Sequence, residues 1–201
     1  AVDARKNLID WLPMRRSAAE SLKGQTETLV AAATAAAAWF RRPAPSALSA
    51  ARTARLRALG WREAAVIANK SLRGLPKSDA ADVSYALREA VEHSAQAVSE
   101  AVRYGLEPDA GLLKTAEAVR EAAVALAAAA AGRGKTRVDA LMLAKKWAGE
   151  AERLRRLTRS NAQEEFSLTN ALKRETVSTR LSNAAEAMQQ ACDALAGGLA
   201  E

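Results

Sequence analysis

Two short segments of the chain resemble each other, and each places a glutamate inside an apolar helical pattern. The first segment, residues 61–67, contains Glu63, and the second, residues 148–154, contains Glu150. Apolar residues lie three, four or seven positions from each glutamate, which predicts that both carboxylates face the protein core. These neighbours are Leu56, Leu59, Val66 and Ile67 for Glu63, and Leu143, Trp147, Leu154 and Leu157 for Glu150. Because a buried carboxylate needs a cation, a proton or a metal ion as its partner, the two segments predict a duplicated site.

Further acids could complete such a site. The candidates on other predicted helices, or close to Glu150, are Glu89, Glu92, Glu152, Glu186 and Asp193. An inward-facing ring of these carboxylates could bind a hard or transition metal ion through oxygen. Alanine or serine occupies many positions that such a ring would need, so salt bridges to nearby arginines are the simpler expectation for most of the acids.

Basic residues form two clusters along the chain. No acid occurs between Glu27 and Glu63, whereas several arginines do, and a second basic group lies between residues 145 and 159. The candidates for binding an anion or a partner are Arg52, Arg55, Arg62, Lys145, Arg153 and Arg156. Arginine suits bidentate phosphate contacts, although a solvated helix face explains the same pattern. No helix-turn-helix signature or aromatic stacking surface accompanies the charge, so specific nucleic-acid recognition is not expected.

Three other motifs have ordinary explanations. Gly134-Lys135-Thr136 resembles the end of a phosphate-binding loop, but Ala129 stands where the first glycine is required, and the segment follows a helix instead of a strand. The single histidine, His93, excludes His-rich metal sites and is best explained as a surface or partly packed side chain. Cys192 lies on an apolar helical face, which favours a small core residue over a nucleophile.

Composition favours helices over sheets. The 201 residues are 49% hydrophobic, with much alanine, but only 4% aromatic. The formal charge of +7 permits phosphate, polyphosphate, nucleic acid or an anionic membrane face as a partner, and an alanine- and arginine-rich composition explains it equally well. The chain has a single cysteine and shows no signal peptide, and its apolar runs are well short of the ~20 residues that span a bilayer. These features together predict a cytoplasmic protein.

The elements that must position these residues are six helices joined by short loops. The expected ranges are 17–42, 46–73, 78–104, 108–131, 136–161 and 167–196. Short loops make successive helices antiparallel, and helices of this length predict an elongated all-α bundle forming a single domain over residues 1–201. Because Glu63 and Glu150 are far apart in sequence, we expect two similar three-helix halves, at about residues 14–104 and 108–199.

The run Asn7-Leu8-Ile9-Asp10-Trp11-Leu12-Pro13, followed by a helix with Leu22, Gln25 and Leu29, resembles the N-terminus of PhoU-like proteins associated with Pit-type phosphate transporters. The length, the helix order and the two Glu-Ala segments extend the resemblance over the whole chain. The resemblance implies two repeated three-helix units. It also implies a motif in each half of an acid followed four residues later by aspartate, which in many members holds iron or zinc clusters.

This chain departs from the family motif. Trp61 and Ala65 stand at the two acidic positions of the first segment, Ala148 replaces the leading acid of the second, and Ser182 stands four residues before Glu186. Few ligands then remain for each ion, so we expect no resident cofactor and at most weak metal binding.

The resemblance implies a non-enzymatic regulator or accessory protein of phosphate uptake. Such a protein contacts a Pit-type transporter or another membrane partner, peripherally at the inner face of the membrane. The alternative is a basic helical module that binds phosphate, polyphosphate or another anionic ligand. An enzyme is the least favoured class, because no nucleophile–base pair or cofactor loop is visible. The sequence leaves open the oligomeric state, including association between copies of the chain.

Overall fold

The computed structural model describes residues 18–68, 77–107, 109–162 and 167–197, with only the backbone described at 18–19, 62–68, 77–80 and 159–162. Within these ranges the chain forms helices and no strand, which confirms the predicted all-α bundle of six helices. The helices are α2 (Ala18–Arg41), α3 (Pro45–Ala68), α4 (Lys77–Tyr104), α5 (Ala110–Ala131), α6 (Gly134–Ala162) and α7 (Leu168–Gly197).

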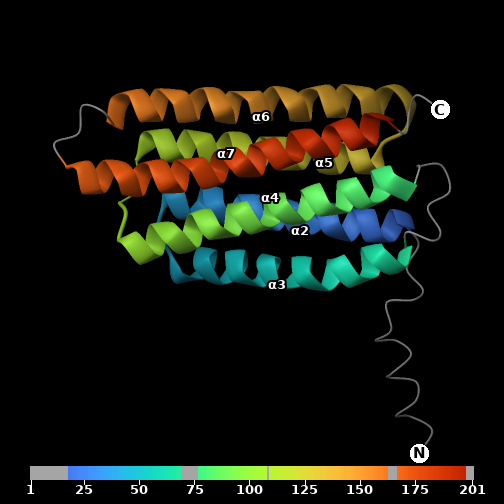
Figure 1. Ribbon diagram of the computed structural model, residues 1–201, viewed down its shortest axis with the longest axis horizontal. Coiled ribbons are helices and arrows are strands. Elements are labelled where there is room, and N and C mark those ends of the chain that lie inside the picture. The colour runs from blue at the N-terminus through green and yellow to red at the C-terminus, as the bar shows by residue number, and fades with distance from the viewer. Residues whose placement is uncertain (1–17, 69–76, 108, 163–166, 198–201) are drawn as a thin grey trace, which may run out of the picture.

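The helices run antiparallel along one long axis (Figure 1). Helices α2, α3 and α4 pack together, as do α5, α6 and α7, and the two groups meet where α2 packs on α5 and α4 packs on α7. Consequently α3 and α6 lie at opposite edges of the bundle, and the other four helices lie between them (Figure 1). The two groups correspond to the expected halves, and their descent from one repeated unit stays a prediction.

Local sequence signals explain where the central helices begin and end. Helix α4 ends at Gly105, whose φ of 60° is a left-handed conformation that glycine adopts without a Cβ clash. The amides of Gly105 and Leu106 donate to the carbonyl oxygens of Val102 and Ala101, at 3.1 and 2.9 Å, which completes a Schellman cap. Helix α5 then begins after Asp109, whose carboxylate accepts the Leu112 amide at 2.8 Å. Helix α6 begins at Gly134, two residues before the expected Thr136.

Alanine dominates the core. Of the 42 buried hydrophobic residues in the described part of the chain, 27 are alanines, so the helices approach one another closely and few large side chains fit between them. The largest buried side chains are spread over the helices, and they include Phe40 on α2, Leu87 on α4, Leu126 on α5, and Leu181 and Met188 on α7. Within the described ranges, no helix combines the length and the apolar character needed to cross a membrane.

The predicted core-facing stripes of α3 and α6 are wrong at four leucines, although Trp147 and Leu154 of α6 are partly buried and pack against the core. Leu56 and Leu59 on α3 are exposed, and so are Leu143 and Leu157 on α6. Helix α6 instead buries Leu141 together with alanines 144, 148 and 151. Each helix has two apolar faces, and the narrow space between closely packed helices selects the alanine face. Val102, near the end of α4, is also exposed.

Candidate functional site

Glu150, the centre of the second sequence segment, is not a buried, isolated carboxylate. Its side chain is 31% exposed and forms a bidentate ion pair with Arg153 one turn later, at 2.7 Å from Nε and 2.6 Å from Nη2. The hydrogen bonds from Arg153 lower the pKa of Glu150. The prediction of a buried, unpaired acid is therefore wrong at this position, because Glu150 is paired with Arg153 and lies at the edge of the core, where Trp147 and Leu154 are only partly buried.

The side chain of Glu63 lies outside the described residues, so its partners are not assigned. Of the four apolar positions that placed it on the core face, Leu56 and Leu59 are described and are both exposed, and the side chains of Val66 and Ile67 lie outside the described residues. The buried face of α3 is formed by Ala47, Ala51, Ala54 and Ala58. The premise of a buried, unpaired acid is therefore wrong for Glu150, and for Glu63 it stays a prediction.

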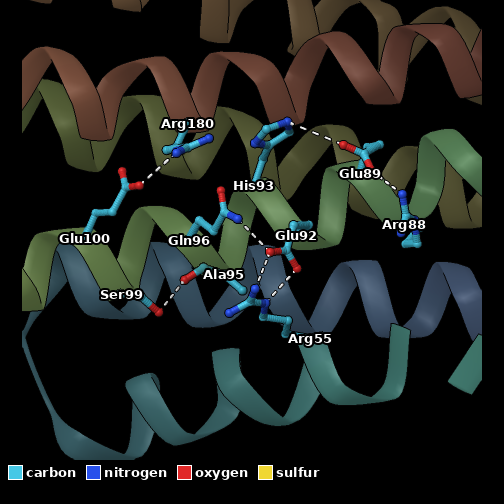
Figure 2. Close-up of polar contacts among 10 residues, drawn as sticks. All are labelled: Arg55, Arg88, Glu89, Glu92, His93, Ala95, Gln96, Ser99, Glu100 and Arg180. Carbon is cyan, nitrogen blue, oxygen red and sulfur yellow. Dashed lines mark hydrogen bonds and ion pairs between the residues drawn. The ribbon is translucent and has the colours of Figure 1, made fainter. Parts of the chain in front are cut away.

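The acids of α4 link this helix to its neighbours on both sides. Figure 2 shows Glu92 facing Arg55 of α3, which donates from Nε at 2.7 Å and from Nη2 at 2.6 Å. Gln96, one turn along, donates to the same carboxylate at 2.6 Å. On the other side of α4, Glu100 accepts from Arg180 of α7 at 2.9 and 3.0 Å (Figure 2). The Arg55–Glu92 pair thus links α3 to α4 within the first group of helices, and the Glu100–Arg180 pair links α4 to α7 across the junction between the two groups.

A second polar cluster lies between α6 and α7. Arg155 donates to Glu152 at 3.0 and 3.1 Å and to Glu175 at 3.3 Å, and Ser182 donates to Glu152 from the opposite helix. These hydrogen bonds, the one from Arg155 foremost, lower the pKa of Glu152. The cluster borders a groove of about 540 Å³, which Arg156, Asn183 and Gln189 also line. The groove is lined by two acids, Glu152 and Glu186, and two arginines, Arg155 and Arg156, so its charges are balanced.

The remaining candidate acids lie apart from one another. Asp193 pairs with Lys145 at 2.5 Å across the α6–α7 contact, and Glu186 is exposed on α7. Glu89 pairs with Arg88 at 2.6 Å and lies 3.8 Å from Nε2 of His93 (Figure 2). In the described part of the chain, no three His, Cys, Asp or Glu residues gather as a metal site would require. The expectation of salt bridges is confirmed for Glu89, Glu92, Glu150, Glu152 and Asp193.

Elemental analysis of the purified protein is expected to find far less than one iron or zinc ion per chain. Five of the candidate acids already have a cationic partner, so a metal ion would have to displace those cations before it could bind. Inductively coupled plasma mass spectrometry after purification without chelators measures this directly. A content near one ion per chain would contradict the expectation and would show that the altered motifs still bind metal.

His93 is partly buried and carries a nitrogen without a hydrogen-bond partner. Its side chain is 19% exposed, and its buried Nδ1 has no hydrogen-bond partner. Burial lowers the pKa of His93, and Arg180 acts in the same direction, whereas Glu89, Glu92 and Glu100 raise it. The net direction is downward, so the folded protein favours the neutral imidazole more than the unfolded chain does.

The lowered pKa of His93 predicts a pH-dependent stability. The neutral imidazole of His93 contributes to the free energy of unfolding. This contribution is fully present above the ordinary histidine pKa, near 6.5, and it is lost as the pH falls through the lower pKa of the folded state. We therefore expect the free energy of unfolding, measured with urea, to be lower at pH 5.5 than at pH 7.5. His93→Gln should reduce this difference, and an unchanged difference in the variant would assign the pH dependence to other groups.

Cys192 is a core residue, as expected. It is fully buried on α7, and burial raises the pKa of its thiol to about 11. We predict that iodoacetamide at pH 8 alkylates native Cys192 at least about tenfold more slowly than the same thiol in urea, because both access and thiolate formation are suppressed. Equal rates in the two conditions, followed by mass spectrometry, would show that the thiol is accessible in the folded chain.

The candidate basic residues are mostly paired as well. Arg55, Lys145 and Arg153 form the pairs already described, and Arg156 lies 3.8 Å from Glu152. Arg52 is exposed on α3, and the side chain of Arg62 lies outside the described residues.

The distribution of charge is more informative than any single pair. Helix α6 carries eight basic and three acidic residues, and α3 carries four basic residues and one acid. In the other four helices, basic residues do not outnumber acids. The positive charge is therefore concentrated on the two edge helices (Figure 1).

Sequence reasoning missed the contacts that hold the α4–α5 turn to α7. Lys173 donates from Nζ to the Tyr104 carbonyl at 3.1 Å, and Nε of Arg174 lies 3.7 Å from the capping carboxylate of Asp109. The Glu100–Arg180 pair continues the same junction. One signal was available, since Glu89, His93, Gln96 and Glu100 form a polar stripe with helical spacing on α4.

No protein-family model matches the chain, and no curated protein matches it either.

Proposed function

We propose that this protein is a non-enzymatic regulator or accessory protein of inorganic phosphate transport, acting by protein–protein contact with a phosphate permease. The proposal depends on the resemblance to PhoU-like proteins, and the grouping of the helices into two sets of three is compatible with it. The observation that carries it is the concentration of positive charge on α3 and α6. Both are edge helices, so each presents a long basic surface to a partner.

The test is co-purification with a permease. A tagged full-length chain is incubated with detergent-solubilised membranes that contain a Pit-type phosphate permease, and the permease is quantified in the eluate. We expect recovery, with a loss in the charge-reversal variants Arg52→Glu on α3 or Lys146→Glu on α6, depending on which edge makes the contact. Lys114→Glu is the matched control, because Lys114 is exposed on α5, a helix without excess positive charge.

The proposal fails if the tagged chain recovers no permease while a metal-binding PhoU-like protein, tested in parallel, does. If neither charge reversal reduces the recovery of the permease, the permease remains the partner, but the basic edge helices do not make the contact.

A second candidate function, the binding of phosphate or polyphosphate, is favoured by the polar groove between α6 and α7. Arg156 and the hydroxyl and amide groups of the groove are suitable for an oxyanion, although Arg155 is already engaged by Glu152 and Glu175. Isothermal calorimetry with orthophosphate and a short polyphosphate separates the two functions. Heat of binding that moderate salt abolishes, together with no permease recovery, would favour the ligand-binding module.

A further inference from the structure

The outward side of α6 combines apolar and basic side chains along a single line. We define the outer line of α6 as Val138, Met142, Lys146, Arg153, Arg156 and Leu157. At 3.6 residues per turn these positions share one side of the helix, opposite the buried Ala144, Ala148 and Ala151. All six are exposed, and Met142 is the most exposed of the three apolar residues, at 67%.

The outer line is available for contact along its whole length. Helix α6 packs on α5 and α7 and forms an edge of the bundle, so the described structure leaves its outward side uncovered (Figure 1). Scattered exposed apolar residues are normal on a protein surface. Here, in contrast, three of them lie in one row with three cations, and at 1.5 Å per residue the row extends over roughly 30 Å.

The charges of the outer line favour an anionic contact. Lys146 has no ion-pair partner among the described residues, and the guanidinium groups of Arg153 and Arg156 remain largely exposed while they pair with Glu150 and Glu152. The edge helix as a whole carries five more basic than acidic residues. Such a surface attracts negatively charged headgroups and repels cationic ones.

We propose that the outer line of α6 binds the surface of an anionic lipid bilayer, with the helix axis parallel to the membrane. A headgroup region accepts both kinds of side chain at once, because the apolar side chains enter the acyl boundary while lysine and arginine stay among the phosphates. An acidic protein segment would satisfy the cations but would leave Met142 and Leu157 against polar groups. This inference rests on the proposed function and deepens it, since it places the protein on the bilayer that contains the permease.

Vesicle co-sedimentation tests the proposal with the full-length protein. We expect binding to vesicles of phosphatidylglycerol and phosphatidylcholine, little binding to pure phosphatidylcholine, and a loss of binding in raised salt. The double variant Lys146→Glu/Arg156→Glu should bind at least about 25-fold more weakly, at about fivefold for each cation removed. Met142→Gln leaves the charge unchanged and should weaken binding severalfold. Val124→Gln, which removes an exposed apolar side chain from α5, is the matched control and should have no effect.

Three results would overturn the proposal. They are equal binding to neutral and anionic vesicles, wild-type affinity in the double variant, and binding to a polyglutamate peptide without binding to anionic vesicles. The last result would assign the outer line to an acidic protein partner. Circular dichroism and thermal midpoints like those of the wild type establish that each variant is folded.

Failure of this inference is distinguishable from failure of the proposed function. Permease recovery in detergent, where no bilayer is present, combined with an absence of vesicle binding would retain the function and reject the lipid contact. Vesicle binding without permease recovery would reject the function and retain the lipid contact.

Discussion

Replacing Leu141 with alanine is expected to lower the free energy of unfolding by about 2–5 kcal/mol, the usual cost of removing a buried leucine side chain. Leu141 is 5% exposed and is the large aliphatic residue on the otherwise alanine-lined inner face of α6. Its neighbours are held on a closely packed backbone, so they cannot collapse fully into the cavity. Urea unfolding followed by circular dichroism measures the change.

Leu143 provides the matched control, because it is the same residue type on the same helix but 46% exposed. Leu143→Ala should change the free energy of unfolding by less than about 0.5 kcal/mol, as is usual for a surface substitution. The pair tests the orientation of α6 directly. A larger loss for Leu143→Ala than for Leu141→Ala would support the leucine stripe predicted from the sequence, and it would contradict the alanine face observed in the structure.

Replacing Gly24 with alanine is expected to destabilise the protein by about 1–3 kcal/mol through overpacking. A Cβ at this position would lie 2.1 Å from Cζ2 of the Trp61 indole, which packs from α3 onto α2. The ring cannot move away freely, because its Nε1 donates to Thr28 at 3.1 Å. This clash outweighs the gain of up to about 1 kcal/mol in helix propensity that alanine normally brings.

Gly60→Ala is the control for Gly24→Ala, since Gly60 lies within α3 and its Cβ would meet nothing within 4 Å. It should stabilise the protein by about 0.5–1 kcal/mol. In a Trp61→Ala background, Gly24→Ala should also become stabilising, because the clashing ring is absent. If Gly24→Ala remained destabilising there, the cost would have a source other than Trp61. Chemical denaturation of the wild type, the two single variants Gly24→Ala and Trp61→Ala, and their combination completes this double-mutant cycle.

The positions of the helices were largely predictable from the sequence because their ends carry strong local signals. Gly105 ends α4 as expected, since its left-handed conformation is a backbone requirement that glycine meets most easily. On α7, Cys192 is buried as expected, and the buried residues from Val177 to Leu195 include it. The start of α6 was less accurate, because Gly134 and Thr136 both offer plausible first turns.

The orientation of α3 and α6 was not predictable from apolar spacing. On both helices, alanines and leucines form separate faces, and a hydrophobic pattern gives leucine the greater weight. The observed choice depends on the distance between neighbouring helix axes, which no single helix encodes. Because Leu143 and Leu157 face outward, Glu150 is a partly exposed, ion-paired side chain and not the buried ligand that the spacing predicted.

The sequence allowed us to predict that the candidate acids form salt bridges, but not which cation pairs with each acid when the two lie on different helices. Acids and arginines at helical spacing indicate salt bridges, and most candidate acids do form them. The partners of Glu92 and Glu100 are Arg55 and Arg180, which lie on other helices, so the pairs depend on how three helices are placed beside one another. Pairs within one helix, such as Glu150 with Arg153, follow from spacing, whereas pairs between helices require the tertiary arrangement.

The alanine-rich interior has a thermodynamic consequence. An alanine methyl group exposes less apolar surface to water on unfolding than a leucine or phenylalanine side chain does, and apolar hydration is the main source of the heat-capacity increment. A bundle lined chiefly by methyl groups should therefore have a small heat capacity of unfolding for its length. Its stability should vary gently with temperature, over a broad curve instead of a sharp dome.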